Sequence, residues 1–162
     1  MSARTRGVVA CVLLLVLAGC SSDPPEIDAP DLSAADAAAC RDLVDALPDT
    51  LAGQDRVDVT GETSYGAAWG DPAIVLTCGV DEPEAFTDSS TCVQMDTTGW
   101  FVPDDVLLSD DDSLDVTTTE MNYRPRVELF VPGDYRPEGF TNSIGAIGPL
   151  VQQHLKRVGR CH

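Results

Sequence analysis

Four cysteines constrain the fold of this chain more than any other feature of its sequence. They are spread over most of the 162 residues and are Cys40, Cys78, Cys92 and Cys161. Because no Cys-x-x-Cys pair occurs, the spacing argues against a zinc site, and we expect no bound metal. Four cysteines allow three disulfide pairings. We expect Cys78–Cys92, which would join neighbouring strands, and Cys40–Cys161, which would join the first helix to the end of the last.

The N-terminus predicts export to an oxidising compartment. Arg4 and Arg6 precede an apolar run over residues 8–17, which has the length of a signal-peptide core and is too short to span a bilayer. Leu17-Ala18-Gly19-Cys20 resembles a lipobox, the signal for bacterial lipoprotein processing, in which the cysteine receives a diacylglycerol and becomes the first mature residue. We therefore expect Cys20 to anchor the protein on the extracytoplasmic face of the cell membrane. An ordinary signal peptide with a chance cysteine is the alternative.

The rest of the chain divides into a tether and one domain. Residues 1–19 form the signal peptide, and residues 20–32 hold the lipidated cysteine and a segment rich in serine, proline and acidic residues. Ile27 is the only large apolar residue of residues 21–31, so we expect this segment to be a flexible tether that buries too little surface to fold. Residues 33–162 have the usual size of a single domain.

The charge of the mature chain limits its partners. Without Arg4 and Arg6 the chain keeps eight basic residues against 27 acidic residues, a formal charge of −19. This charge argues against nucleic acid and against lying flat on anionic lipid, since both surfaces attract positive charge. The simplest interpretation is a solvated, repulsive surface, and the alternative is a surface that binds cationic partners or cations.

Hydrophobic patterning predicts a helix, several strands and a final helix. The first helix is expected over residues 33–47 with Ser33 as its cap, and the last along the apolar spacing from residue 144 to residue 158. Residues 73–80 read as a strand buried on both faces, and residues 126–131 alternate as a half-buried strand. Shorter strands are expected over 56–60, 92–95, 100–102 and 116–121, the last an outer strand, whereas 63–72 is rich in turn residues. The order predicts an α+β domain, in which an antiparallel or mixed β-sheet carries the N-terminal and C-terminal helices on one face and disulfides join its parts.

Two motifs carry a resemblance to a known family. The first is Trp69-Gly70-Asp71-Pro72-Ala73-Ile74-Val75-Leu76-Thr77-Cys78-Gly79-Val80, and the second is Arg124-Pro125-Arg126-Val127-Glu128-Leu129-Phe130-Val131-Pro132. Together with the lipobox, the early helix with its cysteine and the closing helix, they resemble an actinobacterial family of small envelope lipoproteins of unknown function. The resemblance covers nearly all of the mature domain. It implies an envelope location and paired cysteines, and it implies no catalytic residue.

The sequence offers few groups for catalysis. The mature domain has only two histidines, of which His162 is the last residue and His154 lies on the apolar stripe of the last helix, where a partly buried structural role is expected. Ser64 misses the Gly-x-Ser-x-Gly spacing of a nucleophile elbow. No phosphate loop or dinucleotide fingerprint occurs, so we expect no cofactor. The acidic residues 109–115 do not fit the positions of an EF-hand loop, which leaves a weak cation site open there.

These features predict a non-catalytic binding module of the cell envelope. Its partner would be another envelope protein or a wall component, and the expected binding surface contains Trp69, Asp71 and Trp100. A second hypothesis is a carrier or sensor that holds a small ligand between the sheet and its helices. A third is a carbohydrate-active enzyme, which would need two facing carboxyl groups. Asp71, near Trp69, is its best candidate; the alternative is structural, because Gly-Asp-Pro is also a common turn and Trp69 suits a core anchor.

Overall fold

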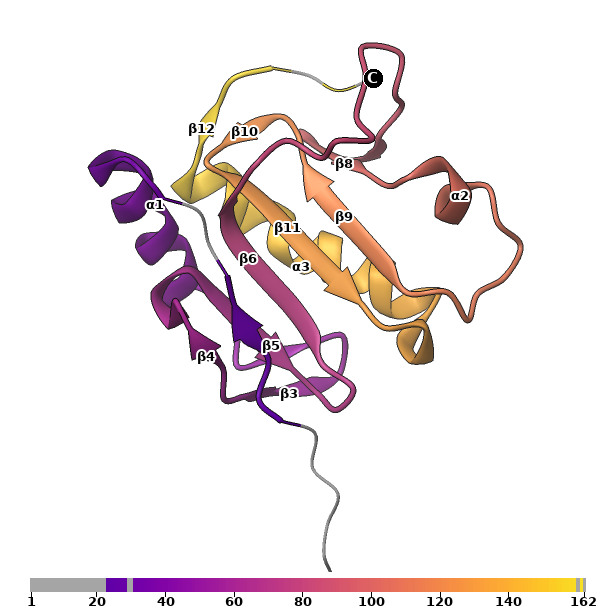
Figure 1. The fold of residues 1–162 in the computed structure, drawn as a ribbon, viewed down its shortest axis with the longest axis horizontal. Coiled ribbons are helices and arrows are strands. Elements are labelled where there is room, and N and C mark those ends of the chain that lie inside the picture. Colours follow the sequence, from indigo (N-terminus) through magenta and orange to yellow (C-terminus); the bar gives the residue numbers. More distant parts are fainter. Residues whose placement is uncertain (1–22, 29–30, 160, 162) are drawn as a thin grey trace, which may run out of the picture.

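The computed structural model describes residues 23–28, 31–159 and 161. Within these residues, eight strands form one antiparallel sheet, in the order β2-β3-β5-β6-β11-β9-β8-β7. Their bounds in that order are Thr50–Leu51, Gln54–Val57, Gly66–Trp69, Ile74–Val80, Arg126–Val131, Val116–Glu120, Thr98–Phe101 and Val93–Met95. Helices α1 (Ala34–Asp45) and α3 (Glu138–His154) contact each other and the same face of this sheet (Figure 1). The predicted α+β fold is therefore confirmed.

Smaller elements complete the fold. β1 (Glu26–Ile27) pairs in parallel with β4 (Thr60–Gly61), and β10 (Tyr123–Arg124) pairs antiparallel with β12 (Lys156–Arg157). The short helices are η1 (Thr63–Tyr65), α2 (Asp104–Leu107) and η2 (Gly133–Tyr135). In the described part of the chain, none of the helices combines the length and the apolar character needed to cross a bilayer.

The first helix forms as its sequence predicts. Ser33 caps α1, because its Oγ accepts a hydrogen bond from the backbone N–H of Asp36 at 3.2 Å and donates one to the Asp36 carboxylate at 2.7 Å. Cys40, Leu43 and Val44 form the buried side of the helix and face β6. These contacts place α1 against the centre of the sheet.

The two disulfides do not pair as expected. Cys40 is bonded to Cys78, and Cys92 is bonded to Cys161. The expected Cys78–Cys92 bond is wrong because β6 and β7 are not neighbours: β11, β9 and β8 lie between them. Cys78 instead lies on the face of β6 that α1 covers, and the chain end returns past α3 to the edge strand β7.

Two strands also differ from their predictions. Residues 66–69 were expected within a turn, yet they form β5, whose four residues are all buried between β3 and β6. The Thr-rich strand β9 was expected at the outside of the sheet but lies between β11 and β8. It is tolerated there because Thr118 donates its hydroxyl hydrogen to the backbone oxygen of Phe101 at 2.8 Å, which satisfies a buried polar group.

The expected tether departs from its prediction over residues 23–28, which pack onto the domain. Ile27 is only 1% exposed, and its backbone oxygen accepts a hydrogen bond from Glu62 at 2.9 Å. The residue beneath it is Gly66, where a Cβ atom would lie 2.6 Å from Ile27 Cδ1. Since Gly66 carries no side chain, β1 lies directly on the sheet, on the face opposite α3 (Figure 1).

Candidate functional site

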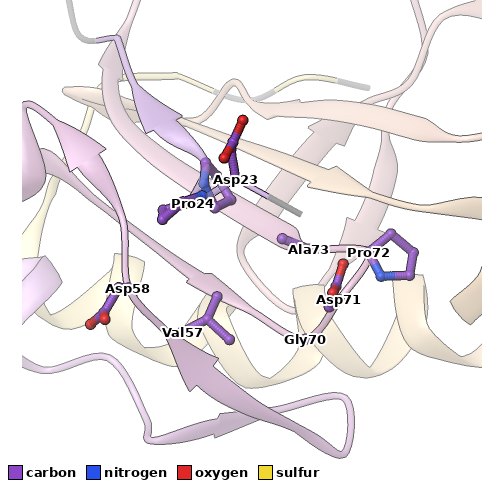
Figure 2. Close-up of a pocket in the computed structure, with 9 residues that line it drawn as sticks. Asp23, Pro24, Val57, Asp58, Gly70, Asp71, Pro72 and Ala73 are labelled. Carbon is purple, nitrogen blue, oxygen red and sulfur yellow. The ribbon is translucent and has the colours of Figure 1, made fainter. Parts of the chain in front are cut away.

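A pocket of about 450 Å³ lies beside the docked N-terminal segment. Three parts of the chain line it: residues 23–25, Val57 with Asp58 at the end of β3, and residues 70–73 in the turn between β5 and β6 (Figure 2). Its volume falls within the range of small-molecule sites, which is roughly 300 to 1,000 Å³. The pocket exists because β1 holds residues 23–25 against the sheet.

The turn at residues 70–73 is fixed from behind by Tyr135. Gly70 has a φ of +82°, and a Cβ atom there would lie 2.8 Å from the Tyr135 hydroxyl oxygen, so glycine is required on both grounds. The same hydroxyl group is hydrogen-bonded to the backbone of Asp71. Burial raises the pKa of Tyr135, as does the charge of Asp134, so the phenol stays protonated at neutral pH. Tyr135 therefore supports this wall of the pocket through packing and a hydrogen bond.

The pocket combines an apolar lining with acidic residues. Val57, Pro24 and Pro72 contribute apolar surface, and Asp23, Asp58 and Asp71 are exposed aspartates around it. Figure 2 shows the three carboxylates on different sides of the pocket, with Asp58 directed away from Asp71. The arrangement suits a ligand with a positive charge on an apolar body, and it does not present two carboxylates to one reacting atom.

Of the three residues expected on the binding surface, one lines the pocket. Asp71 does so, but Trp69 and Trp100 are both 0% exposed, so neither belongs to a binding surface. For Trp69 the alternative of a core anchor holds instead. Each indole N–H is used inside the protein: Trp69 donates to the backbone oxygen of Pro48, and Trp100 donates to the Thr98 hydroxyl, both at 3.0 Å. Both tryptophans therefore anchor the core.

The remaining predicted site residues have structural surroundings or lie outside the described residues. All four disulfide cysteines are bonded, as reported above, whereas Cys20 and His162 fall outside the described residues. His154 ends α3 and is half-buried, as expected. Ser64 is exposed in η1. His154, the one histidine that the structure describes, does not line the pocket.

The acidic loop is organised by its own hydrogen bonds. Ser113 donates to Asp111 through its hydroxyl group at 2.6 Å and its backbone N–H at 2.9 Å, and these bonds lower the pKa of Asp111. Asp115 accepts a hydrogen bond from the backbone N–H of Gly133. Among the residues described by the structure, no three histidine, cysteine or acidic side chains gather in a way that could hold a metal ion.

The sequence does not identify several of the residues that line the pocket. Pro24, Pro25, Val57 and Asp58 were assigned to a tether and an ordinary strand, because nothing in their sequence shows that the N-terminal segment returns to the sheet. The available signal was Ile27, a single large apolar residue in an otherwise polar segment. It indicates one point of attachment, and the matching Gly66 lies far along the chain.

Comparison with known proteins identifies a family and no function. Residues 5–158 match a family described as "Protein of unknown function (DUF3515)". No curated protein and no solved structure matches the chain.

Proposed function

The chain belongs to the DUF3515 family, and we propose that it is an exported lipoprotein that binds a ligand close to the membrane. In this proposal Cys20 carries the lipid on the extracytoplasmic face of the membrane, and the domain is a non-catalytic binding module of the cell envelope. The proposal places the protein among the small envelope lipoproteins of actinobacteria. It is supported by the lipobox, by the apolar run before it and by the pocket beside residue 23.

The observation that carries the proposal is the docking of residues 23–28. Cys20 precedes Asp23 by three residues, and a fully extended chain of that length spans about 10 Å. Since Asp23 lines the pocket, a lipid on Cys20 would hold the pocket within roughly that distance of the lipid headgroups. A long flexible tether would leave the domain free to turn, whereas this short one restricts which side faces the membrane.

The pocket supports a ligand with a cationic group. Asp23, Asp58 and Asp71 surround an apolar lining, and the formal charge of the mature chain is −19. A cationic group in the pocket is therefore attracted both by these three carboxylates and by the overall negative charge of the protein. Cationic groups on an envelope protein or wall component fit this chemistry. The second candidate, a carrier of a small molecule, is favoured by the pocket volume of about 450 Å³. Its ligand would bind beside β1 and not between the sheet and the helices, because fully buried side chains such as Leu76 and Ile147 fill that space.

The anchor is tested by peptide mass mapping of the protein purified from its native membrane. We expect a diacylglyceryl group on a peptide that begins at Cys20, and we expect Cys20→Ala to release the protein from the membrane fraction. An unmodified Cys20 in a protein that still resides on the membrane would reject the lipid anchor.

The position of the pocket is tested by a fluorophore attached to the lipidated protein in vesicles that contain a headgroup-quenching lipid. Attachment at the exposed Pro72, beside the pocket, should give strong quenching. Attachment at the exposed Ser89, in the loop between β6 and β7, serves as the matched control and should give little. Equal quenching at both positions would mean that the domain has no fixed side toward the membrane.

The ligand class is tested with a small apolar amine, butylammonium. Asp71→Asn should weaken its binding by roughly tenfold, because one charge-assisted contact is lost. Asp88→Asn, which removes the same charge at an exposed position outside the pocket, should leave binding nearly unchanged. If both variants weaken binding equally, the attraction is that of the overall charge and the pocket is not the site.

A further inference from the structure

A second cavity, of about 220 Å³, lies at the other end of the molecule from β1, where β10 and β12 pair (Figure 1). Its walls include the apolar side chains of Phe86, Met121 and Val158, and the guanidinium group of Arg124 also lines it. Glu82 is the acidic residue of this wall. The lining is therefore mixed, with an arginine and a glutamate beside apolar side chains. The cavity is smaller than the roughly 300 to 1,000 Å³ of most ligand sites, so it has room only for a small molecule.

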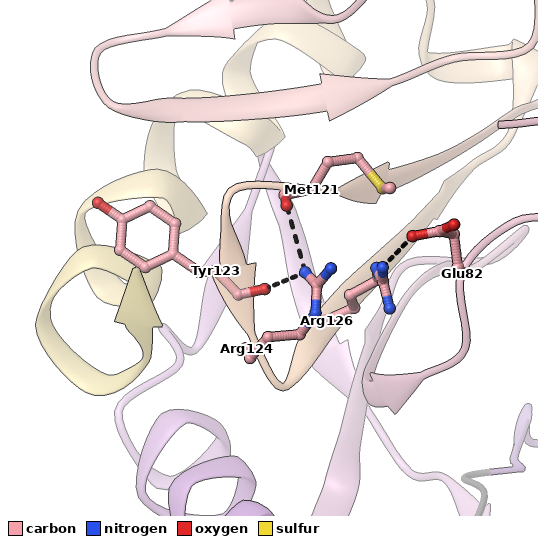
Figure 3. Close-up of polar contacts among 5 residues, drawn as sticks. All are labelled: Glu82, Met121, Tyr123, Arg124 and Arg126. Carbon is pink, nitrogen blue, oxygen red and sulfur yellow. Dashed lines mark hydrogen bonds and ion pairs between the residues drawn. The ribbon is translucent and has the colours of Figure 1, made fainter. Parts of the chain in front are cut away.

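Arg124 keeps part of its hydrogen-bonding capacity free for a ligand. Its Nη1 donates to the backbone oxygens of Tyr123 at 2.7 Å and Met121 at 3.2 Å, and these bonds hold the guanidinium group in place (Figure 3). Its Nε and Nη2 make no hydrogen bond to any other described residue, and none of the described carboxylates forms an ion pair with it. The group is half-buried. Burial lowers the pKa of Arg124, the charge of Arg126 lowers it further, and the charges of Glu82 and Glu120 oppose this shift.

The charge around Arg124 is unusual for this protein. Arg126 lies beside it and pairs with Glu82, so the carboxylate nearest the cavity is already engaged (Figure 3). Lys156 on β12 is the register partner of Arg124, and Arg157 is the partner of Tyr123. Half of the eight basic residues that follow Cys20 are therefore gathered at this end of a strongly acidic chain.

We propose that this cavity binds the carboxylate of a small organic acid with a short apolar tail, and that Arg124 is the residue that binds it. The planar guanidinium group matches a carboxylate through two parallel N–H donors, and here Nε and Nη2 supply them. Phe86, Met121 and Val158 receive the tail. Glu82 disfavours a phosphate more than a carboxylate, because a phosphate group carries up to two negative charges at neutral pH.

The test uses the full-length chain in detergent micelles and follows backbone amide signals by NMR during titration with butyrate. We expect saturable shifts at Gly159 and Cys161, which line the cavity. Arg124→Gln should weaken binding by roughly tenfold or more, because a charge-assisted pair is lost. Arg157→Gln is the matched control: it removes the same charge from an exposed residue outside the cavity and should change binding by no more than about twofold.

A second variant keeps the test valid if Arg124→Gln alters the fold. Val158→Asp places a negative charge at the rim of the cavity on a residue that is 52% exposed, so it should abolish binding and leave the protein folded. Leu108→Asp, at a residue that is 78% exposed and outside the cavity, should bind butyrate normally.

Three results would overturn the proposal. Butyramide has the same tail without the charge, and equal binding of butyramide and butyrate would exclude a role for the guanidinium group. Tighter binding of inorganic phosphate would exclude the carboxylate. Equal weakening by Arg124→Gln and Arg157→Gln would mean that butyrate is attracted only by the overall charge of this end of the molecule.

Discussion

Glu120 shows how one buried side chain fixes a turn. Its carboxylate is fully buried and accepts three backbone hydrogen bonds, from Gly99 at 3.1 Å, Asn122 at 3.0 Å and Tyr123 at 2.8 Å. Burial raises the pKa of Glu120, and the three N–H donors oppose that shift. The side chain therefore ties the turn between β9 and β10 to strand β8.

Glu120→Gln should lower the free energy of unfolding by about 2 to 3 kcal/mol at neutral pH. The amide places a donor where an oxygen accepted hydrogen bonds, so at least one buried N–H group loses its partner. Denaturant unfolding measures the change, with Glu84→Gln, at an exposed glutamate, as the control. Equal stability of the two variants would show that the turn does not depend on this carboxylate.

Glu128 makes the unfolding free energy depend on pH in the opposite direction to a carboxylate in a salt bridge. It is half-buried on β11, between its register partners Thr77 and Thr119, and burial raises its pKa above the 4.5 that is ordinary for glutamate. The folded chain therefore holds this proton more tightly than the unfolded chain does. Ionised Glu128 lowers the unfolding free energy at neutral pH, and the penalty shrinks as the pH falls through the raised value toward the unfolded one.

Glu128→Gln should accordingly be more stable than the unsubstituted protein at pH 7, by less than about 1 kcal/mol. The difference should stay constant down to the raised pKa of Glu128, decrease from there toward the pKa of the unfolded chain, and vanish below it. Unfolding free energies measured for both proteins across this range provide the test. A difference that does not change with pH would mean that the substitution acts through packing and not through charge.

Among the elements, β1 is held by backbone hydrogen bonds to β4 and Glu62 and by one buried apolar side chain, Ile27. Ile27 lies over Gly66, and Ile27→Ala should lower the unfolding free energy by about 2 to 4 kcal/mol, the usual range for a large-to-small change at a buried site. Glu26→Ala, at the exposed neighbour, should change it by less than about 0.5 kcal/mol. Denaturant unfolding and limited proteolysis between residues 22 and 34 measure both effects. If Ile27→Ala is as mild as the control, the segment is a tether after all.

The difference between local patterns and contacts with distant residues explains which elements the sequence predicts. The sequence predicts α1, β6 and β11 because each carries a local pattern. α1 has a capping residue, β6 is a continuous apolar run, and β11 has apolar residues at every second position. β5 was missed because Gly66-Ala67-Ala68-Trp69 shows no alternation and is followed by Gly-Asp-Pro, which is typical of a turn. Gly66 is needed in this strand because Ile27 of β1 packs directly on it.

Features that depend on distant partners were harder to predict. The disulfide pairing follows from strand order, which separates Cys78 from Cys92 by three strands, and no local pattern reports that order. Trp69 was proposed for the binding surface with a core anchor as the alternative, and the structure shows the core anchor, whose indole N–H donates to the distant Pro48. Trp100 was proposed for the same surface, and no local pattern shows that the fold buries it. Only Asp71 of the expected surface lines the pocket, for which the N-terminal segment supplies one wall.

At the scale of the whole molecule, the two cavities lie at opposite ends and differ in charge. The cavity beside β1 carries Asp23, Asp58 and Asp71, whereas the one beside β12 is lined by Arg124 and by Glu82, which pairs with Arg126. A lipid on Cys20 would hold the cavity beside residue 23 next to the membrane, and the pairing of β10 with β12 would lie farther from it (Figure 1). This orientation follows from the proposed anchor and from β1 together, because neither alone would fix the domain relative to the bilayer.

Insertion of about 20 Gly and Ser residues after Ser22 separates the anchor from β1. A flexible linker of that length spans roughly 25 Å on average, so the quenching of a fluorophore at Pro72 should fall to the level of the control at Ser89. The unfolding free energy should stay unchanged, because Ile27 keeps its contact with Gly66. Persistent quenching would show that the domain binds the membrane through its own surface. Reduced quenching together with reduced stability would show that the insertion had detached β1, and Ile27→Ala provides the reference for that state.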